Sequence, residues 1–199
     1  MKLLAYEEAY MKKNKLEEII SVAASLMSER GYEATSFQEI ARKVGLQKSS
    51  LFHYLNNKEE LLIRIFDRSI DEVSANLDKI IKNKGLKPEE KLKLAVENHI
   101  ISFIKSRDAT IIWLNELGNL SKKNQKRFLK RRKEYERTFQ KIITELKEEG
   151  YFEGLDVKII LFGILGMLNW TPRWYRSDGR LGPNVISEIF YKMILGKRA

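Results

Sequence analysis

The spacing of apolar residues constrains the fold of this 199-residue chain more than any other feature of its sequence. No stretch alternates apolar and polar residues over the length of a strand, whereas apolar side chains recur every three or four positions in one segment after another. Only three prolines interrupt this rhythm. The pattern therefore predicts an all-α fold of about nine helices.

Glycines and capping residues indicate where the predicted helices begin and end. A first helix ends near Gly31, a second covers residues 37–44 behind capping boxes that start at Thr35 and Ser36, and Asn57 caps the fourth. Gly45 separates the second helix from a third. The third helix is expected at 47–55 and the later ones at 88–106, 110–117, 121–149, 156–172 (ended by Pro172) and 183–195.

The fourth predicted helix is unusually long, because its apolar rhythm runs from Leu61 to Ile81. A chain of this length fits a small module followed by a larger one. We therefore expect an N-terminal three-helix domain of residues 1–60, which the long helix joins to a C-terminal helical domain of residues 61–199.

Charge and composition narrow the possible partners. Lys and Arg outnumber Asp and Glu by 37 to 27, and a net charge of +10 favours a polyanion such as nucleic acid or an acidic membrane surface. The absence of cysteine excludes disulfides, thiolate zinc sites and cysteine nucleophiles. Glu7 and Glu8 stand where a secretory signal needs its apolar core, so we expect a cytoplasmic protein. The longest apolar stretch, 159–170, is shorter than the roughly 20 residues that span a bilayer, so we expect a buried helix and no membrane partner.

The two short helices around Gly45 have the arrangement of a helix-turn-helix, whose second helix lies in the major groove of DNA. Leu51 and Leu55 would anchor that helix to its own core. The outward side would carry the polar residues Gln47, Lys48, Ser49, Ser50 and His53. On spacing alone, a capped helical hairpin with solvated polar residues explains the pattern equally well.

The run from Gly31 to Leu61, GYEATSFQEIARKVGLQKSSLFHYLNNKEEL, closely resembles the DNA-binding signature of the TetR family of repressors. The resemblance implies a homodimer on a palindromic double-stranded DNA operator, and a C-terminal domain whose small-molecule effector releases the DNA. It places Lys48, Ser50 and His53 at bases or nearby phosphates. On the DNA backbone it places Thr35, Ser36, Tyr54 and Lys58, and Phe52 stands where the family usually has a tyrosine, which removes a hydroxyl that could meet a phosphate.

A second segment, FGILGMLNWTPRWYRSDG at 162–179, is similar to the branch of that family that responds to fatty acyl-CoA thioesters, the FadR-like and KstR-like regulators. The resemblance implies a long-chain acyl-CoA effector. Gly163 and Gly166 would let another helix approach closely, which suits dimer packing. The aromatic and basic residues that follow, Trp170, Arg173 and Trp174, either contact the effector or close the end of the dimer helix.

Further candidate effector residues come from two other places in the C-terminal part. Phe103, Trp113 and Leu117 either line an apolar tunnel or belong to the core. Residues 122–133 hold eight cations and no acid, and form either a solvated helix face or a surface for phosphates of a ligand or of DNA. Arg127 and Arg131 of this run are the candidates for the nucleotide phosphates. Within the repressor reading, the alternative effector is a hydrophobic cation such as a drug or dye.

Two other classes of function compete with a repressor. An enzyme has little support, because the chain has only two histidines, one in the recognition helix and one, His99, whose neighbours indicate a satisfied, partly buried imidazole. We expect no catalytic residue, metal site or cofactor. A sequence-blind architectural or membrane-surface protein could use the basic helix, but random duplex DNA would then compete fully for binding.

Overall fold

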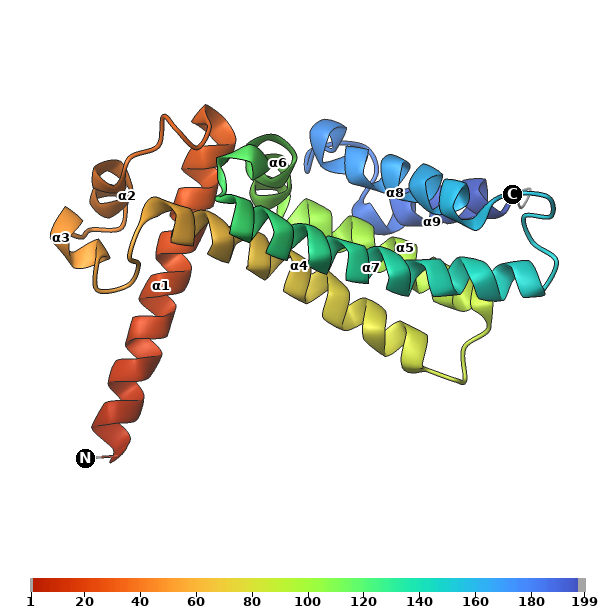
Figure 1. Cartoon of the computed structure of the whole chain (residues 1–199), viewed down its shortest axis with the longest axis horizontal. Coiled ribbons are helices and arrows are strands. Elements are labelled where there is room, and N and C mark those ends of the chain that lie inside the picture. Colours follow the sequence, from red (N-terminus) through yellow and green to blue (C-terminus); the bar gives the residue numbers. More distant parts are fainter. Residues whose placement is uncertain (1, 197–199) are drawn as a thin grey trace. The chain divides into compact units, whose positions relative to one another are not determined.

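All the regular secondary structure of the described residues is helical, as predicted (Figure 1). The computed structural model describes residues 2–196, leaving out the side chains of 2–5, 8 and 114. Over that range there is no strand. The elements are α1 (Lys2–Arg30), α2 (Phe37–Lys43), α3 (Lys48–Leu51), α4 (Lys58–Lys82), α5 (Pro88–Lys105), α6 (Arg107–Glu116), the 3-10 turn η1 (Leu117–Asn119), α7 (Lys122–Glu148), α8 (Val157–Trp174) and α9 (Pro183–Leu195).

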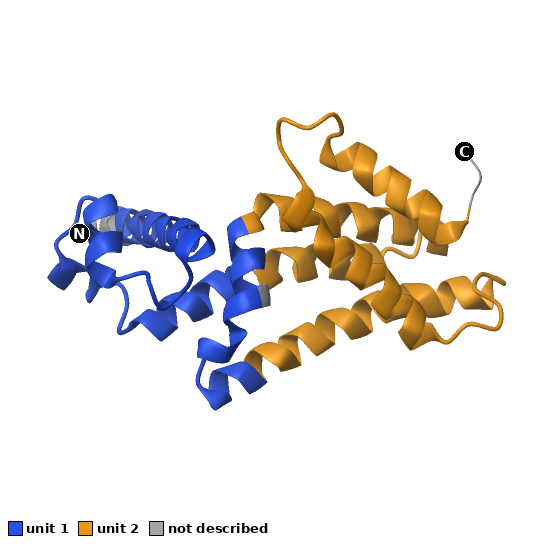
Figure 2. Ribbon diagram, turned by 90° about the horizontal axis from the view of Figure 1, so that it is seen from above, with its two compact units in different colours: residues 1–68, 108–126 blue, residues 69–107, 127–199 orange. Residues whose placement is uncertain are grey.

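The chain divides into two compact units, shown in blue and orange in Figure 2. The first comprises residues 1–68 and 108–126, and the second comprises residues 69–107 and 127–199. The first unit therefore takes in α6 and the start of α7 besides the N-terminal helices. The expected division into 1–60 and 61–199 remains a proposal about the domains.

The core of the first unit is built where α1, α2, α3 and the start of α4 meet. α2 packs on both α1 and α3. Polar contacts outside this core also hold the unit together, since Glu59 accepts hydrogen bonds from the Ser121 amide at 2.6 Å and from Asn124 at 2.9 Å. The fully buried side chains include Ile19, Leu26, Met27, Ile40, Leu51, Leu55, Leu61, Leu62, Ile65 and Phe66.

Most of the predicted helix ends are confirmed. Gly31 adopts a φ of +87° just after α1, and Asn57 Oδ1 accepts from the Glu60 amide at 2.8 Å before α4. Ser36 caps α2 by accepting from the Glu39 amide at 3.1 Å. Thr35 does not cap it, because its hydroxyl donates to the Gly31 carbonyl at 3.0 Å. α3 spans only four residues and is followed by turns, so the third helix is shorter than expected.

The core of the second unit lies among α5, α7, α8 and α9, and α5 packs against both α8 and α9. Its buried residues include Leu92, Val96, Ile100, Phe139, Ile142, Ile143, Leu146, Leu161, Leu165 and Leu168. Lys91 is a buried lysine, and its amine is paired with Glu145 at 2.7 Å, which compensates part of the cost of its burial.

Two expectations about α8 are wrong. The helix does not end at Pro172 but continues to Trp174. Pro172 has no N–H to donate to the Leu168 carbonyl one turn earlier. The helix nevertheless continues beyond it, with a bond from the Tyr175 amide to the Thr171 carbonyl at 2.9 Å, and Arg107 donates to the Pro172 carbonyl at 3.1 Å. The stretch 159–170 is also not a buried helix throughout, since Ile159 and Phe162 are exposed. No helix of the described residues is long and apolar enough to cross a membrane.

Candidate functional site

The turn between α2 and α3 fixes the direction in which α3 leaves the core. Gly45 takes a φ of +69°, a conformation that side chains with a Cβ rarely adopt. The Leu46 amide donates back to the Ala41 carbonyl at 2.8 Å, which closes the end of α2. α3 then starts at Lys48, so the local sequence produces two short helices around one sharp turn.

α3 and the turns after it separate an apolar side from a polar side. Leu51 and Leu55 are buried in the core of the first unit, as expected. The polar residues predicted to read DNA fall on the solvent side. Gln47, Lys48, Ser49 and His53 are exposed and Ser50 is half-buried. These side chains supply hydrogen-bond donors and acceptors of the kinds that contact base edges and phosphates.

Phe52 stands on the same surface with 52% of its side chain exposed, and its ring lies 5.5 Å from the ring of Phe37. Tyr54, one of the predicted backbone contacts, is half-buried. An exposed phenylalanine offers no hydrogen bond, so at this position the surface can contact DNA only through van der Waals packing.

The residues before α2 do not share one role. Ser36 is exposed at the helix N-terminus, where backbone N–H groups favour an anion. The expected contact between Thr35 and the DNA backbone is corrected. Its side chain is only 1% exposed and its hydroxyl already donates to Gly31, so Thr35 stabilises the turn and does not offer a group to phosphate.

Lys58 is held at the start of α4 by two contacts. Its ammonium donates to the Glu33 carbonyl at 3.2 Å and lies 4.2 Å above the ring of Tyr32. Burial lowers the pKa of Lys58, and the carboxylates of Glu33 and Glu116 oppose that shift. An ammonium has three N–H groups, so the same arrangement can present a positive charge to a phosphate.

The second unit contains a buried polar cluster that crosses its core. His99 is 1% exposed, its ring stacks on Phe103 at 3.9 Å, and its Nε2 lies 3.0 Å from Asn169 Oδ1. The amide oxygen can only accept, so Nε2 carries the proton and Nδ1 accepts from the Tyr135 hydroxyl at 2.8 Å. Burial lowers the pKa of His99 to about 3 and raises the pKa of Tyr135. The predicted satisfied imidazole is therefore confirmed, and it is fully buried.

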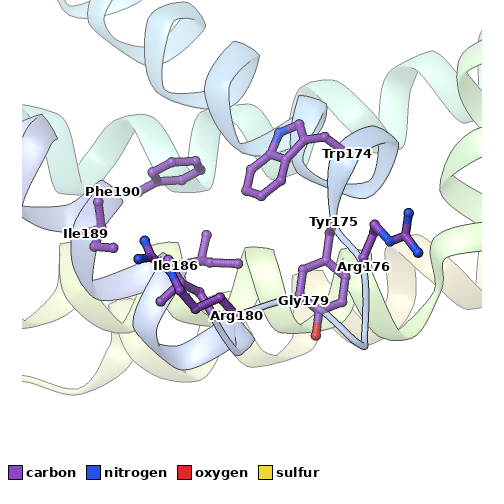
Figure 3. A pocket seen from close by; sticks show the side chains of 9 residues that line it. Trp174, Tyr175, Arg176, Gly179, Arg180, Ile186, Ile189 and Phe190 are labelled. Atoms are coloured by element: carbon purple, nitrogen blue, oxygen red, sulfur yellow. The ribbon is translucent and has the colours of Figure 1, made fainter.

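A cavity of about 380 Å³ lies between the end of α8, the loop that follows and α9 (Figure 3). Trp174 and Phe190 form part of its apolar wall, with their rings 6.4 Å apart and edge to face. Two arginines also line it. Arg176 is held by both oxygens of Asp178 at 3.1 Å, whereas no described side chain pairs with Arg180. Leu181, Ile186 and Ile189 complete the apolar lining.

The structure separates the predicted effector residues. Trp174 lines the cavity, whereas Trp170 and Arg173 sit beside it on α8, with the guanidinium 5.0 Å from the indole ring. Phe103 packs on His99 in the second unit, and Trp113 and Leu117 belong to the first. Of the two candidate phosphate-binding arginines, both on α7, Arg127 is exposed and Arg131 is paired with Asp71.

The α9 part of the cavity was not predicted from the sequence. Ile186 and Phe190 come from the helix predicted at 183–195, to which no effector residue had been assigned. No sequence signal brings them to Trp174, because the juxtaposition depends on how α9 packs along α5. The segment 162–179, whose sequence is similar to the acyl-CoA-responsive branch, does include three other lining residues, Tyr175, Arg176 and Gly179.

One face formed by α8 and α9 is apolar and exposed. On α8, Gly163 and Gly166 are open, since a Cβ added at either would meet no described atom within 4 Å. The large exposed residues on this pair of helices are Ile159, Phe162, Trp170, Trp174, Val185, Ile189 and Met193. Exposed apolar surface of this extent is typical of an interaction site.

Comparison with known proteins covers both parts of the chain. Residues 19–65 match the family model of bacterial regulatory proteins of the tetR family, and residues 85–197 match the model of the tetracyclin repressor-like C-terminal domain. A fatty acid metabolism regulator protein of Bacillus subtilis is 27% identical over 92% of this chain and 95% of its own length. The repressor KstR2 of Mycobacterium tuberculosis is 26% identical over 90% of each chain.

A solved structure is also similar over nearly the whole chain. It is the crystal structure of AibR in complex with isovaleryl coenzyme A and operator DNA. Its TM-score is 0.80 at 28% identity, and the match covers 91% of this chain and 98% of that one. The sequence, the fold and this bound neighbour therefore point to the same class of protein.

Proposed function

Because this chain belongs to the TetR family of bacterial regulatory proteins, we propose that it represses transcription by binding a palindromic operator as a homodimer. We further propose that a long-chain acyl-CoA binds the protein and releases it from the operator. Members of this family are transcriptional regulators, which rules out the rival reading of the chain as an enzyme. The DNA-binding part of this proposal rests on one observation. α3 and the turn after it have a buried apolar side, which holds them to the core, and an exposed polar side.

The operator contacts divide into two groups. Lys48, Ser50 and His53 read base edges, assisted by Gln47 and Ser49 on the same exposed face. Ser36, Tyr54 and Lys58 hold the DNA backbone, and Phe52 packs against it. Because phosphate contacts carry no sequence information, only the first group sets which duplex is bound.

Selection of the bound duplexes from a random-sequence pool tests this half of the proposal. We expect a palindrome whose half-sites lie about one helical turn, or a multiple of it, apart. A large excess of random duplex should leave the selected complex intact. Recovery of unrelated sequences, together with full competition by random duplex, would instead support the sequence-blind alternative.

Dimerisation is proposed to use the part of the exposed apolar face of α8 and α9 that excludes Trp170, Trp174 and Ile189, which are proposed below for the effector site. The open glycines Gly163 and Gly166 allow a second helix to approach the backbone, and the surrounding residues are large and apolar. A homodimer is normally closed by a two-fold axis, so the same face of each copy would meet. This arrangement explains why so apolar a surface is left exposed on one chain.

The effector half of the proposal rests on the cavity at the end of α8. Its walls combine an apolar lining with two arginines, which suits a ligand that has an apolar part and an anionic part. A fatty acyl-CoA has both. The AibR neighbour binds isovaleryl coenzyme A, and the B. subtilis relative is a fatty acid metabolism regulator, which supports the same class of ligand. Trp170 and Arg173, next to the cavity on α8, are proposed to extend the site.

Titration with acyl-CoAs of increasing chain length tests the effector. Burial contributes about 0.8 kcal/mol per methylene, so affinity should rise about fourfold per carbon until the apolar site is full. Free CoA should bind weakly. Trp170 and Trp174 provide a fluorescence signal beside the cavity. Release of DNA also requires that the ligand prefer the state that cannot bind DNA.

A matched pair of variants sharpens this titration. Arg180 lines the cavity, and no described side chain pairs with it. Arg180→Ala should therefore weaken acyl-CoA binding. Arg137→Ala removes an exposed arginine of α7 and should leave binding unchanged. If no acyl-CoA changes the fluorescence or displaces DNA, while a cationic dye does both, the effector is the hydrophobic cation instead.

A further inference from the structure

A side chain from α1 binds the carbonyl at the end of α2. Val44 caps the C-terminus of α2, and its amide and those of the next two residues donate back to carbonyls of α2. The Val44 carbonyl accepts a hydrogen bond from the ammonium of Lys15 at 2.7 Å. The last carbonyls of a helix need such partners because no further turn supplies their amides, and a lysine side chain can fill this role.

Lys15 is placed for this contact by its own helix. Its side chain is 28% exposed, whereas the preceding lysines of α1, Lys12 and Lys13, are exposed. Glu18, which lies about one helical turn after Lys15, accepts from the same ammonium at 2.8 Å. The ammonium therefore bridges a carboxylate of α1 and the carbonyl at the end of α2. A hydrogen bond from a charged donor is stronger than one between neutral groups.

The same turn of α1 is also tied to α4. Glu17 pairs with Arg68 at 3.1 Å, with both side chains about half exposed. Residues 15–18 thus contact both the end of α2 and α4, and all of these residues belong to the first unit. The match to the tetR family model begins at residue 19, so this turn lies just before the part of the chain that the match covers. The proposed operator contacts do not include it.

We propose that Lys15 is a positioning residue for operator recognition, and that its bond to the Val44 carbonyl fixes the direction in which α3 leaves α2. Residues 44–47 alone connect the two helices. A rotation of the peptide after Val44 therefore moves Lys48, Ser50 and His53 relative to the rest of the unit. This inference rests on the proposed function, because it gives Lys15 a role only if α3 reads DNA.

The burial of the surrounding residues shows why such a restraint matters. Val44 is buried before the turn, and Leu51 and Leu55 are buried after it, but none of the residues 45–50 between them is fully buried. Apolar burial resists displacement without fixing a direction, whereas a hydrogen bond constrains both a distance and an angle. The bond of the Leu46 amide ties the turn only to α2. The bond from Lys15 ties it to a second helix.

A direct contact between Lys15 and a DNA phosphate is the competing role for this lysine. An ammonium has three N–H groups, and two oxygens of the chain already accept from that of Lys15. The carboxylate of Glu18 also offsets its charge. Both observations favour positioning. The two roles predict different salt dependence, because each phosphate contact contributes about 0.9 to the slope of log affinity against log salt concentration.

Titration of the full chain with the selected duplex and with a scrambled one, over a salt series, tests the proposal. Lys15→Met removes the donor but keeps a long side chain that suits a helix. It should lower the ratio of the two affinities about fivefold, the equivalent of one hydrogen bond, and leave the salt slope unchanged. Lys15→Arg keeps a charged donor and should recover most of the ratio. Lys12→Met makes the same change at an exposed lysine about one turn earlier and should leave the ratio as it was.

Amide hydrogen exchange of the chain without DNA gives a second reading. The Leu46 amide, which closes the end of α2, should exchange about fivefold faster in Lys15→Met than in the unaltered chain. The amide of Ile65, in the buried part of α4, should exchange at an unchanged rate. A general loss of stability would instead accelerate both amides, so this comparison separates a local restraint on the turn from a merely structural role.

The outcomes separate this proposal from the proposed function. If the unaltered chain binds both duplexes equally, operator reading itself fails, and the role of Lys15 fails with it. If the unaltered chain discriminates and Lys15→Met discriminates equally well, the proposal for Lys15 alone is overturned, whatever the exchange rates show. Equal weakening on both duplexes with a shallower salt slope would make Lys15 a phosphate contact. An equal loss of the ratio in Lys12→Met would attribute the effect to charge, and also overturns the proposal.

Discussion

The buried His99 predicts a specific loss of stability as the solution becomes acidic. Its pKa in the folded chain is about 3, against 6.5 for an unperturbed histidine, because burial disfavours the imidazolium. A group whose pKa is depressed by folding stabilises the fold above its unfolded pKa and loses that contribution as the pH falls toward the folded one. The unfolded chain binds this proton between pH 6.5 and 3, and the folded chain does not.

The size of the effect follows from the two pKa values. Between pH 7 and pH 5 the unfolded histidine changes from mostly neutral to almost fully protonated, while the folded one stays neutral. This linkage lowers the free energy of unfolding by about 2 kcal/mol between those two pH values. The hydrogen bonds explain the same preference, since a proton on Nδ1 would take away the acceptor that the Tyr135 hydroxyl uses.

Urea unfolding at pH 7 and at pH 5, at one fixed chain concentration, measures the difference. His99→Gln keeps a polar side chain but cannot titrate, so its loss of stability between the two pH values should be smaller by about 2 kcal/mol. His53→Gln is the control, because His53 is exposed. An equal loss in the unaltered chain and in His99→Gln would refute the assignment of a neutral, buried imidazole.

Three further predictions test single contacts. Ser36→Ala removes the side-chain cap of α2 and should lower the free energy of unfolding by about 1 kcal/mol, whereas Ser49→Ala should change it little. Gly166→Arg places bulk and charge on the exposed face of α8, and should give monomers by sedimentation; a variant that stays dimeric excludes this interface. Lys58→Ala should weaken binding to specific and scrambled duplexes by about the same factor, and a change in sequence preference would contradict a phosphate contact.

The sequence predicted the local structure where one residue decides it. Gly31 and Gly45 need a positive φ, and Ser36 and Asn57 cap helices with their own side chains, so these ends follow from the residues themselves. The shortness of α3 did not follow, because the residues after Leu51 are compatible with a helix and depart from it only in the folded unit.

Features that depend on tertiary packing were harder to predict from the sequence. Pro172 stays inside α8 although it has no N–H for the Leu168 carbonyl, and Arg107, distant in sequence, donates to the Pro172 carbonyl near the end of the helix. The apolar stretch at 159–170 predicted burial, but hydrophobicity does not tell whether the covering surface belongs to the same chain or to a second one. The sequence of α8 predicted only part of the wall of the cavity at Trp174, because Ile186 and Phe190 reach the cavity from α9.

Operator discrimination by the residues on the exposed face of α3 tests the central claim most directly. Lys48→Ala, Ser50→Ala and His53→Ala would each be scored on the selected duplex and on a scrambled one at fixed salt. We predict that each lost base contact costs about 1–3 kcal/mol on the selected duplex and little on the scrambled one, so that the ratio of the two affinities falls. If all three variants keep the ratio of the unaltered chain, α3 does not read the operator.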